Sequence, residues 1–100
     1  MVVSNEPGVY FSGQYGIRIE NLVRVEYRSA ADESATGHGP FVGFVDLTVM
    51  PYARELSDKR LLSRLEIKQT DRYHETVFEL LSEDLNEQER LWLKQATLPL

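Results

Sequence analysis

The sequence has 100 residues, which is the size of a single small domain or of a piece of a larger protein. Its net charge of −5 argues against the basic surface that nucleic-acid binding requires. The absence of cysteine excludes disulfides and thiolate zinc sites and is compatible with a cytoplasmic location. Residues Met1–Gly8 lack the pattern of a signal peptide, and no apolar run approaches the roughly 20 residues of a membrane span, so we expect no membrane partner.

The stretch from Glu6 to Glu20 predicts a β-hairpin with Gly13 in its loop, where glycine readily adopts a positive φ. In this register Gly8 faces Arg18, and the two terminal glutamates face each other. Because side chains alternate between the faces of a strand, one face is apolar and the other is polar. The apolar face carries Pro7, Val9, Phe11, Tyr15, Ile17 and Ile19. The polar face carries Glu6, Gly8, Tyr10, Gly16, Arg18 and Glu20.

Glu6 and Glu20 form the most informative pair on the polar face. Directly opposed residues have Cβ atoms roughly 4.5–5.5 Å apart, and like charges placed so closely repel each other. Something positive is therefore expected between them: Arg18, a shared proton or a metal ion. The glycines leave open space beside the carboxylates. The alternative interpretation is a surface strand pair whose glutamates face water, and the pattern alone favours neither.

The chain on either side of the hairpin continues as strand. Met1–Ser4 leads directly into it, and unbroken alternation predicts one long strand over Tyr15–Tyr27. Asn21 lies on the otherwise apolar face of that strand and must find hydrogen-bond partners. The small and polar residues of Ser29–Pro40 predict an exposed loop, and we interpret His38 within it as solvated rather than as a metal ligand or base.

The second half begins with a strand over Phe41–Met50, which is apolar on both faces, as in a strand covered on both sides. Asp46 in this strand is either a third carboxylate of a metal cluster or an aspartate with a structural partner. A charged connection follows over Arg54–Leu62. We interpret His74, further along the chain, as a helix-packing or surface residue rather than as a ligand.

Two helices close the chain. Ser63 and Glu66 form a capping box, which predicts a helix running to about Leu81. A second cap over Asn86–Glu89 predicts a short helix, followed by an extended end. The apolar stripe of the first helix is Ile67, Thr70, Tyr73 or His74, Val77, and Leu80 or Leu81. The sequence therefore predicts an α+β fold, with an antiparallel hairpin and sheet followed by two C-terminal helices.

Several of these stretches resemble the pita-bread metallopeptidases. Glu6-Pro7-Gly8 followed by Gly16-Ile17-Arg18-Ile19-Glu20-Asn21 resembles the closing part of that catalytic domain. Gly43-Phe44, Leu47-Thr48, Pro51-Tyr52, Leu61-Leu62-Ser63, Tyr73-His74 and Thr97-Leu98-Pro99-Leu100 resemble the large Xaa-Pro aminopeptidases (aminopeptidase P). The resemblance implies that 1–52 is the closing β portion of the catalytic domain and that 53–100 is a helical extension. The first residues also look internal, so Met1 need not be a natural start.

The resemblance implies two divalent metal ions, usually manganese, held by two aspartates, a histidine and two glutamates. Glu6 and Glu20 match the two glutamates. By analogy Glu20 bridges both metals, whereas Glu6 binds one metal and helps to move protons. Arg18 matches an arginine that supports the bridging glutamate. The implied substrate is a peptide with proline in second position, from which the first residue is released.

In the family, the two aspartates and the histidine precede the Glu6-Pro7-Gly8 segment, and here only residues 1–5 precede it, with no aspartate or histidine among them. Hard cations take about six ligands, so we expect the metal sites to be unoccupied in these residues and the chain to be inactive alone. Unpaired strand edges favour homo-oligomers. One alternative is a non-catalytic dimerisation or binding module. Another is a relative such as proline dipeptidase, against which the C-terminal helices and the Leu98-Pro99-Leu100 end stand.

Overall fold

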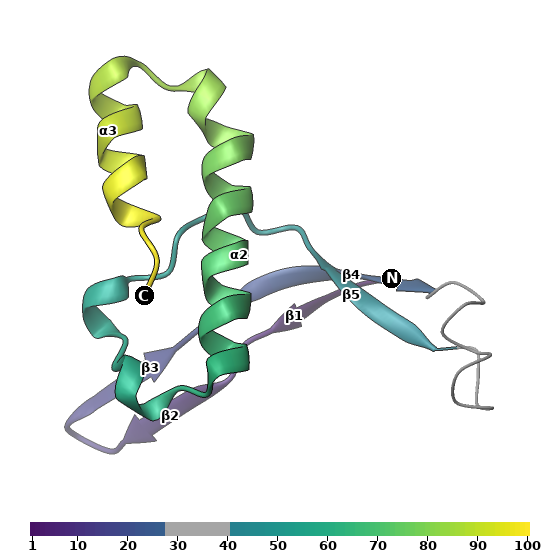
Figure 1. The fold of residues 1–100 in the computed structure, drawn as a ribbon. Coiled ribbons are helices and arrows are strands. Elements are labelled where there is room, and N and C mark those ends of the chain that lie inside the picture. Colours follow the sequence, from purple (N-terminus) through teal and green to yellow (C-terminus); the bar gives the residue numbers. More distant parts are fainter. Residues whose placement is uncertain (28–40) are drawn as a thin grey trace. The chain divides into compact units, whose positions relative to one another are not determined.

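The computed structural model describes residues 1–27 and 41–100, which form two compact units, Met1–Thr48 and Val49–Leu100. The described part of the first unit consists of antiparallel strands, and the second contains two α-helices joined by short turns (Figure 1). The predicted α+β class is therefore confirmed. The predicted loop over Ser29–Pro40, including His38, lies outside the described residues.

Strands β2 (Gly8–Phe11) and β3 (Tyr15–Arg18) form the predicted hairpin. They pair in the predicted register, with Gly8 opposite Arg18. The loop between them contains Gly13 at a φ of 70°, and the Gln14 amide donates to the carbonyl of Phe11 at 3.0 Å. Glycine at this point allows the positive φ that the turn requires.

A three-stranded sheet forms the rest of the described part of the first unit. It contains β1 (Val2–Asn5), β4 (Asn21–Tyr27) and β5 (Val42–Asp46), in the order β1-β4-β5. Both neighbouring pairs are antiparallel. Strand β4 is therefore central. The strand expected over 1–4 lies on one side of it, and the strand expected from residue 41 onward lies on the other.

The prediction of one long strand over Tyr15–Tyr27 is wrong, because β3 ends at Arg18 and β4 begins at Asn21. The interruption lies opposite Pro7. The Ile19 amide donates to the Pro7 carbonyl at 3.1 Å, but proline has no N–H to donate in return. The ladder therefore breaks here, and β3 and β4 belong to different sheets.

Strand β5 differs from its prediction in two respects. It ends at Asp46 rather than at Met50, because the amides of Leu47 and Thr48 both turn to the Leu22 carbonyl, at 2.8 and 3.4 Å. Its apolar side chains are also exposed rather than covered on both faces, with Phe44 at 63%. The pattern identified apolar strand faces correctly, but the layer expected to cover them is not found among the described residues.

In the second unit, α2 (Arg64–Leu81) and α3 (Glu87–Ala96) begin at the predicted caps. The Glu66 amide donates to the Ser63 hydroxyl at 3.2 Å, and the Ser63 amide donates to the Glu66 carboxylate at 2.7 Å. This capping box satisfies two amides that would otherwise lack helical partners. Asn86 caps α3 in the same reciprocal way.

Short 3-10 turns connect these elements. The charged connection contains η1 (Arg54–Leu56) and η2 (Lys59–Leu61), and η3 (Ser82–Asp84) links the two α-helices. Asp58 caps η2, and the guanidinium of Arg60 binds the same carboxylate at 2.7 Å. This ion pair lowers the pKa of Asp58. Local side-chain bonds therefore shape the connection that the sequence identified only by its charge.

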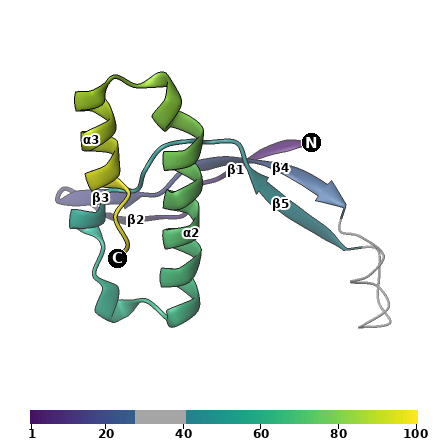
Figure 2. The ribbon, with the colours of Figure 1, turned by 45° about the horizontal axis from the view of Figure 1, so that its top comes forward.

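The core of the second unit lies between α2 and α3, which run side by side (Figures 1 and 2). His74 and Val77 of α2 and Leu93 of α3 are fully buried. The predicted stripe is confirmed at its centre, where His74 rather than Tyr73 is the buried member. The interpretation of His74 as a packing residue is also confirmed. Leu80 lies outside the stripe and is 58% exposed.

Candidate functional site

Glu6 lies in the short gap between β1 and β2, and Glu20 lies in the gap between β3 and β4. The pair Asn5–Asn21 precedes them in the ladder and the pair Gly8–Arg18 follows. The side chains of Glu6 and Glu20 are 46% and 45% exposed. The structure therefore brings together the two carboxylates that the sequence predicted to face each other, on an open face of the first unit.

Arg18 supplies positive charge to both glutamates. One guanidinium nitrogen lies 3.0 Å from a carboxylate oxygen of Glu20, and the other lies 3.7 Å from Oε2 of Glu6. The carboxylate of Glu20, then Tyr10, and then Glu6 raise the pKa of Arg18 above its ordinary value. The guanidinium therefore stays charged and reduces the repulsion between the carboxylates. Of the three positive partners considered from the sequence, this one is present in the chain.

The Tyr10 ring lies over the two glycines of this face. A Cβ atom built on Gly8 would lie 2.5 Å from the Tyr10 hydroxyl oxygen, and one built on Gly16 would lie 2.5 Å from a carbon of the same ring. The expectation of open space beside the carboxylates is therefore wrong, because the ring fills it. The phenol also raises the pKa of Arg18, which couples the ring to the charged cluster.

Ser4 is a further member of the site. Its hydroxyl donates to Oε1 of Glu6 at 2.6 Å, so the two oxygens of this carboxylate have different surroundings. Oε1 is bound by the hydroxyl, and Oε2 faces Arg18. Sequence reasoning missed Ser4, although its spacing of two residues from Glu6 places it on the same strand face.

Asp46 has a structural partner. Its Oδ1 accepts a hydrogen bond from the side-chain amide of Asn21 at 3.3 Å, and Asn21 is only 4% exposed. This confirms that Asn21 is buried and finds a partner, and it supports the interpretation of Asp46 as a partnered aspartate. Within residues 1–27 and 41–100, no three side chains of histidine, cysteine, aspartate or glutamate are grouped so as to hold a metal ion.

His74 lies in the second unit, inside the helical core. Its Nε2 accepts a hydrogen bond from the Tyr52 amide at 3.0 Å, so the proton of the neutral ring belongs on Nδ1. Nδ1 is buried and has no partner in strict hydrogen-bond geometry within residues 1–27 and 41–100, although the Leu98 backbone is close enough to affect the ring. Burial lowers the pKa of His74, and nearby Arg54 lowers it further, whereas the Leu98 backbone and Asp71 act in the opposite direction. These contacts give the ring a structural role.

Comparison with known proteins shows which family contains chains similar to this one. Residues 40–100 match a family described as the C-terminal region of peptidase M24. A probable Xaa-Pro aminopeptidase P of Pyrenophora teres is 41% identical over 98% of this chain and 15% of its own length. An uncharacterised peptidase of Schizosaccharomyces pombe is 37% identical over 100% of this chain and 16% of its own length.

A solved structure is also similar. The crystal structure of X-prolyl aminopeptidase from Caenorhabditis elegans, described as a cytosolic enzyme with a di-nuclear active site, superimposes with a TM-score of 0.82. The two chains are 32% identical, and the match covers 99% of this chain and 16% of the other. No helix among the described residues is long and apolar enough to cross a membrane.

The fold is therefore that of part of a pita-bread aminopeptidase, as the resemblance of the hairpin segment to that family implied. The chain belongs to the peptidase M24 family, and its residues 40–100 are the C-terminal region of that family. It spans about a sixth of the length of the Xaa-Pro aminopeptidases that it matches.

Proposed function

We propose that this chain is the closing part of a metal-dependent, cytoplasmic Xaa-Pro aminopeptidase. The complete enzyme would release the first residue from peptides with proline in second position. The observation that carries the proposal is the facing pair of Glu6 and Glu20, in a chain that is similar over nearly its whole length to an enzyme with a di-nuclear active site. We keep the division into a closing β portion, 1–52, and a helical extension, 53–100, as part of this proposal.

The donor set fits part of a site for two hard divalent cations such as manganese. Carboxylate oxygens are the ligands that such cations prefer, and Glu6 and Glu20 present them from opposite segments on an exposed face. In this proposal Glu20 would be a ligand shared by the two cations, and Glu6 would be a ligand of one of them. Because each cation needs about six ligands, the two glutamates alone would not hold the pair, and the isolated chain would be inactive.

When bound, the metal pair polarises the scissile carbonyl and activates the attacking water. The residues of this chain prepare that step. Glu6 accepts and returns a proton at its carboxylate, while the Ser4 hydroxyl restricts the rotation of that group through Oε1. Arg18 keeps the two carboxylates together by offsetting their like charges. Its permanent charge also keeps it from competing for protons at neutral pH.

A transplant tests this function. The matching segment of the Pyrenophora teres relative is replaced by this chain, and the resulting transplant enzyme is assayed on an Ala-Pro peptide with manganese. We expect cleavage before proline, and a fall in kcat/KM of more than about a hundredfold in Glu6→Ala and Glu20→Ala. Even residues that only support metal ligands are worth roughly 10–100-fold, so true ligands should exceed that effect.

Glu26 provides a matched control for the transplant. It forms an ion pair with Arg24 at the same spacing as Glu20 and Arg18, but glycine lies opposite it in the sheet. Glu26→Ala should leave kcat/KM within about twofold of the parent, because surface ion pairs contribute little. A stable transplant enzyme that keeps full activity in Glu20→Ala would refute the proposed role of this pair.

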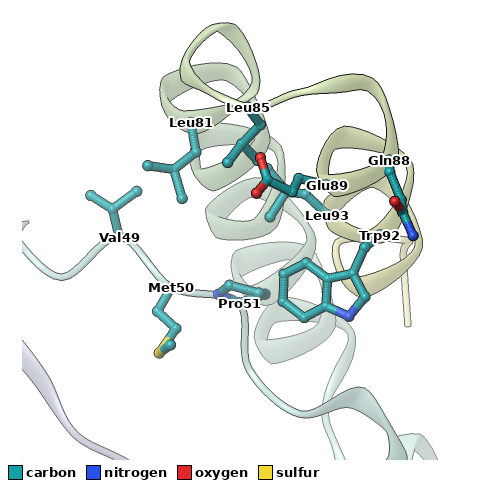
Figure 3. Close-up of a pocket in the computed structure, with 9 residues that line it drawn as sticks. All are labelled: Val49, Met50, Pro51, Leu81, Leu85, Gln88, Glu89, Trp92 and Leu93. Carbon is teal, nitrogen blue, oxygen red and sulfur yellow. The ribbon is translucent and has the colours of Figure 1, made fainter.

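A non-catalytic dimerisation module is the second candidate, favoured by one feature of the second unit. An apolar groove of about 450 Å³ lies between the two α-helices and the segment around Met50, bordered by Leu81 and Leu85 (Figure 3). Trp92 at its edge is 63% exposed. We propose that the chain forms homo-oligomers in either case, because apolar surface of this kind favours association.

Sedimentation of this chain over a range of concentrations tests the association. We expect its mean mass to rise with concentration, and Trp92→Ser to reduce that rise if the groove takes part. Lys94→Ser, on an exposed position of the same helix, is the control. A chain that stays monomeric throughout would contradict the expectation of oligomers.

A further inference from the structure

The end of β5 holds the backbone that directly follows Glu20. The side-chain amide of Asn21 donates to Asp46 at 3.3 Å, and the Leu22 amide donates to the hydroxyl of Thr48 at 2.8 Å. The Leu22 carbonyl in turn accepts the Leu47 amide at 2.8 Å. Two consecutive residues after Glu20 are thus fixed by three consecutive residues of the other segment.

These contacts lie beyond the regular ladder of the sheet. The regular pairing of β4 with β5 ends at Val23 and Asp46. Beyond that point, side-chain hydrogen bonds connect Asn21 and Leu22 to the other segment, and the Leu22 carbonyl accepts from two amides. Asn21 is 4% exposed, so its amide has little water available as an alternative partner. A buried polar group that loses its partner destabilises the folded chain. The backbone of Asn21 is therefore held at the position from which its side chain reaches Asp46.

Glu20 itself lies in the gap between two sheets. It is in neither β3 nor β4, so its place is set by the residues on either side of it. On one side Arg18 is held by pairing with Gly8. On the other side Asn21 pairs with Asn5 and bonds to Asp46. Without the bonds to Asp46 and Thr48, Asn21 and Leu22 would be held only by their pairing with β1, and the half-exposed carboxylate of Glu20 would depend more on its ion pair with Arg18.

We propose that Asp46 and Thr48 are positioning residues for Glu20, which they fix by holding Asn21 and Leu22. This inference rests on the proposed function, in which Glu20 is a metal ligand. It also assigns a task to the first strand of the region 40–100, because β5 lies inside the part that matches the C-terminal family. In this proposal Asp46 and Thr48 of the C-terminal region are not metal ligands themselves, but they determine the position of the metal ligand Glu20.

Conservative substitutions separate positioning from simple folding. Asp46→Asn keeps an oxygen that accepts from Asn21, whereas Asp46→Ala removes it. Thr48→Ser keeps the hydroxyl that accepts from the Leu22 amide, whereas Thr48→Val keeps the volume and removes the acceptor. Asp84→Ala, at the end of η3 in the other unit, is a control for the loss of a carboxylate as such.

The first measurement uses this chain without metal. The three-bond couplings that report the χ1 rotamer of Glu20, and the guanidinium signals of Arg18, are compared among these variants by NMR. We expect Asp46→Ala and Thr48→Val to shift the Glu20 couplings toward rotamer averaging and to weaken the signature of the Arg18 ion pair. Asp46→Asn, Thr48→Ser and Asp84→Ala should match the parent chain.

The second measurement is the affinity of the transplant enzyme for manganese. Asp46→Ala and Thr48→Val should weaken it by about tenfold, the lower end of the effect of residues that support metal ligands. Unchanged Glu20 couplings, or unchanged affinity in a folded variant, would overturn the proposal. If Asp46→Ala fails to fold, Thr48→Val decides. A Glu20→Ala variant with full affinity would instead refute the proposed function itself.

Discussion

Tyr10 shows how a single side chain alters the interpretation of a motif. Gly8 and Gly16 lie on the polar face of the hairpin, and the sequence predicted that they leave room beside the glutamates. The structure places the Tyr10 ring in that room, within 2.5 Å of where either Cβ would lie. Tyr10 is on the predicted face, but no spacing rule states which way a ring turns. The two glycines therefore make room for an aromatic ring that interacts with Arg18 and raises its pKa.

A double-mutant cycle tests whether the Tyr10 ring requires the glycine at position 16. Gly16→Ala should destabilise the chain by about 1–3 kcal/mol, because overpacking forces the ring to move. In a Tyr10→Ala background the same change should be neutral or stabilising by about 0.5–1 kcal/mol, since alanine is less flexible than glycine when unfolded. Urea unfolding of the four proteins measures both steps. Equal effects in the two backgrounds would show that the ring does not need the glycine.

His74 makes the stability of the second unit depend on pH. Its folded pKa lies below the ordinary value of 6.5, so the neutral ring is favoured by folding. Above about pH 6.5 the ring is neutral in both states and stability is complete. As the pH falls below that value, the unfolded chain takes up a proton that the folded chain resists, and stability declines.

The pH dependence can be assigned by substitution. The melting temperature of the parent should fall between pH 7.5 and pH 5.5, because protonation removes the Nε2 acceptor of the Tyr52 amide. His74→Gln keeps an acceptor but does not titrate, so its melting temperature should change less over this range. The only other histidine, His38, provides the control, and His38→Gln should behave like the parent. An unchanged slope in His74→Gln would contradict this assignment.

At the scale of elements, local rules predicted most of the fold. The capping boxes at Ser63 and Asn86 located both helix starts, and alternation around Gly13 located the hairpin and its register. The break between β3 and β4 was missed because it arises from the partner segment. Pro7 interrupts the ladder by lacking an N–H, and nothing in Tyr15–Tyr27 itself signals that loss.

The cap of α2 can be tested alone. Ser63→Ala should reduce the unfolding free energy by about 1 kcal/mol, because the Glu66 amide loses the hydroxyl that accepts its hydrogen bond. Ser63→Thr keeps a hydroxyl and should stay close to the parent. Chemical denaturation monitored by helical circular dichroism gives the comparison. A loss as large in Ser63→Thr as in Ser63→Ala would mean that the hydroxyl is not what stabilises the helix start.

At the scale of the whole molecule, the sequence predicted the pair of glutamates but not the exposure of the surfaces around it. Ile17 and Phe44 belong to apolar strand faces, yet they are 55% and 63% exposed. Periodicity states which residues prefer burial, and it does not state which part of a protein buries them. The sequence predicted that Asn21 needs a partner and offered a structural partner for Asp46, but it did not predict that the two bond to each other or that Ser4 binds Glu6, because these contacts depend on side-chain geometry.

The metal content of the transplant enzyme tests the central claim most directly. After manganese loading and removal of excess metal, elemental analysis should find two manganese ions per chain. Glu20→Ala should lose most of that metal and Glu6→Ala part of it, whereas Glu26→Ala should retain both ions. Full occupancy in the double variant Glu6→Ala and Glu20→Ala, with the fold intact, would contradict the account.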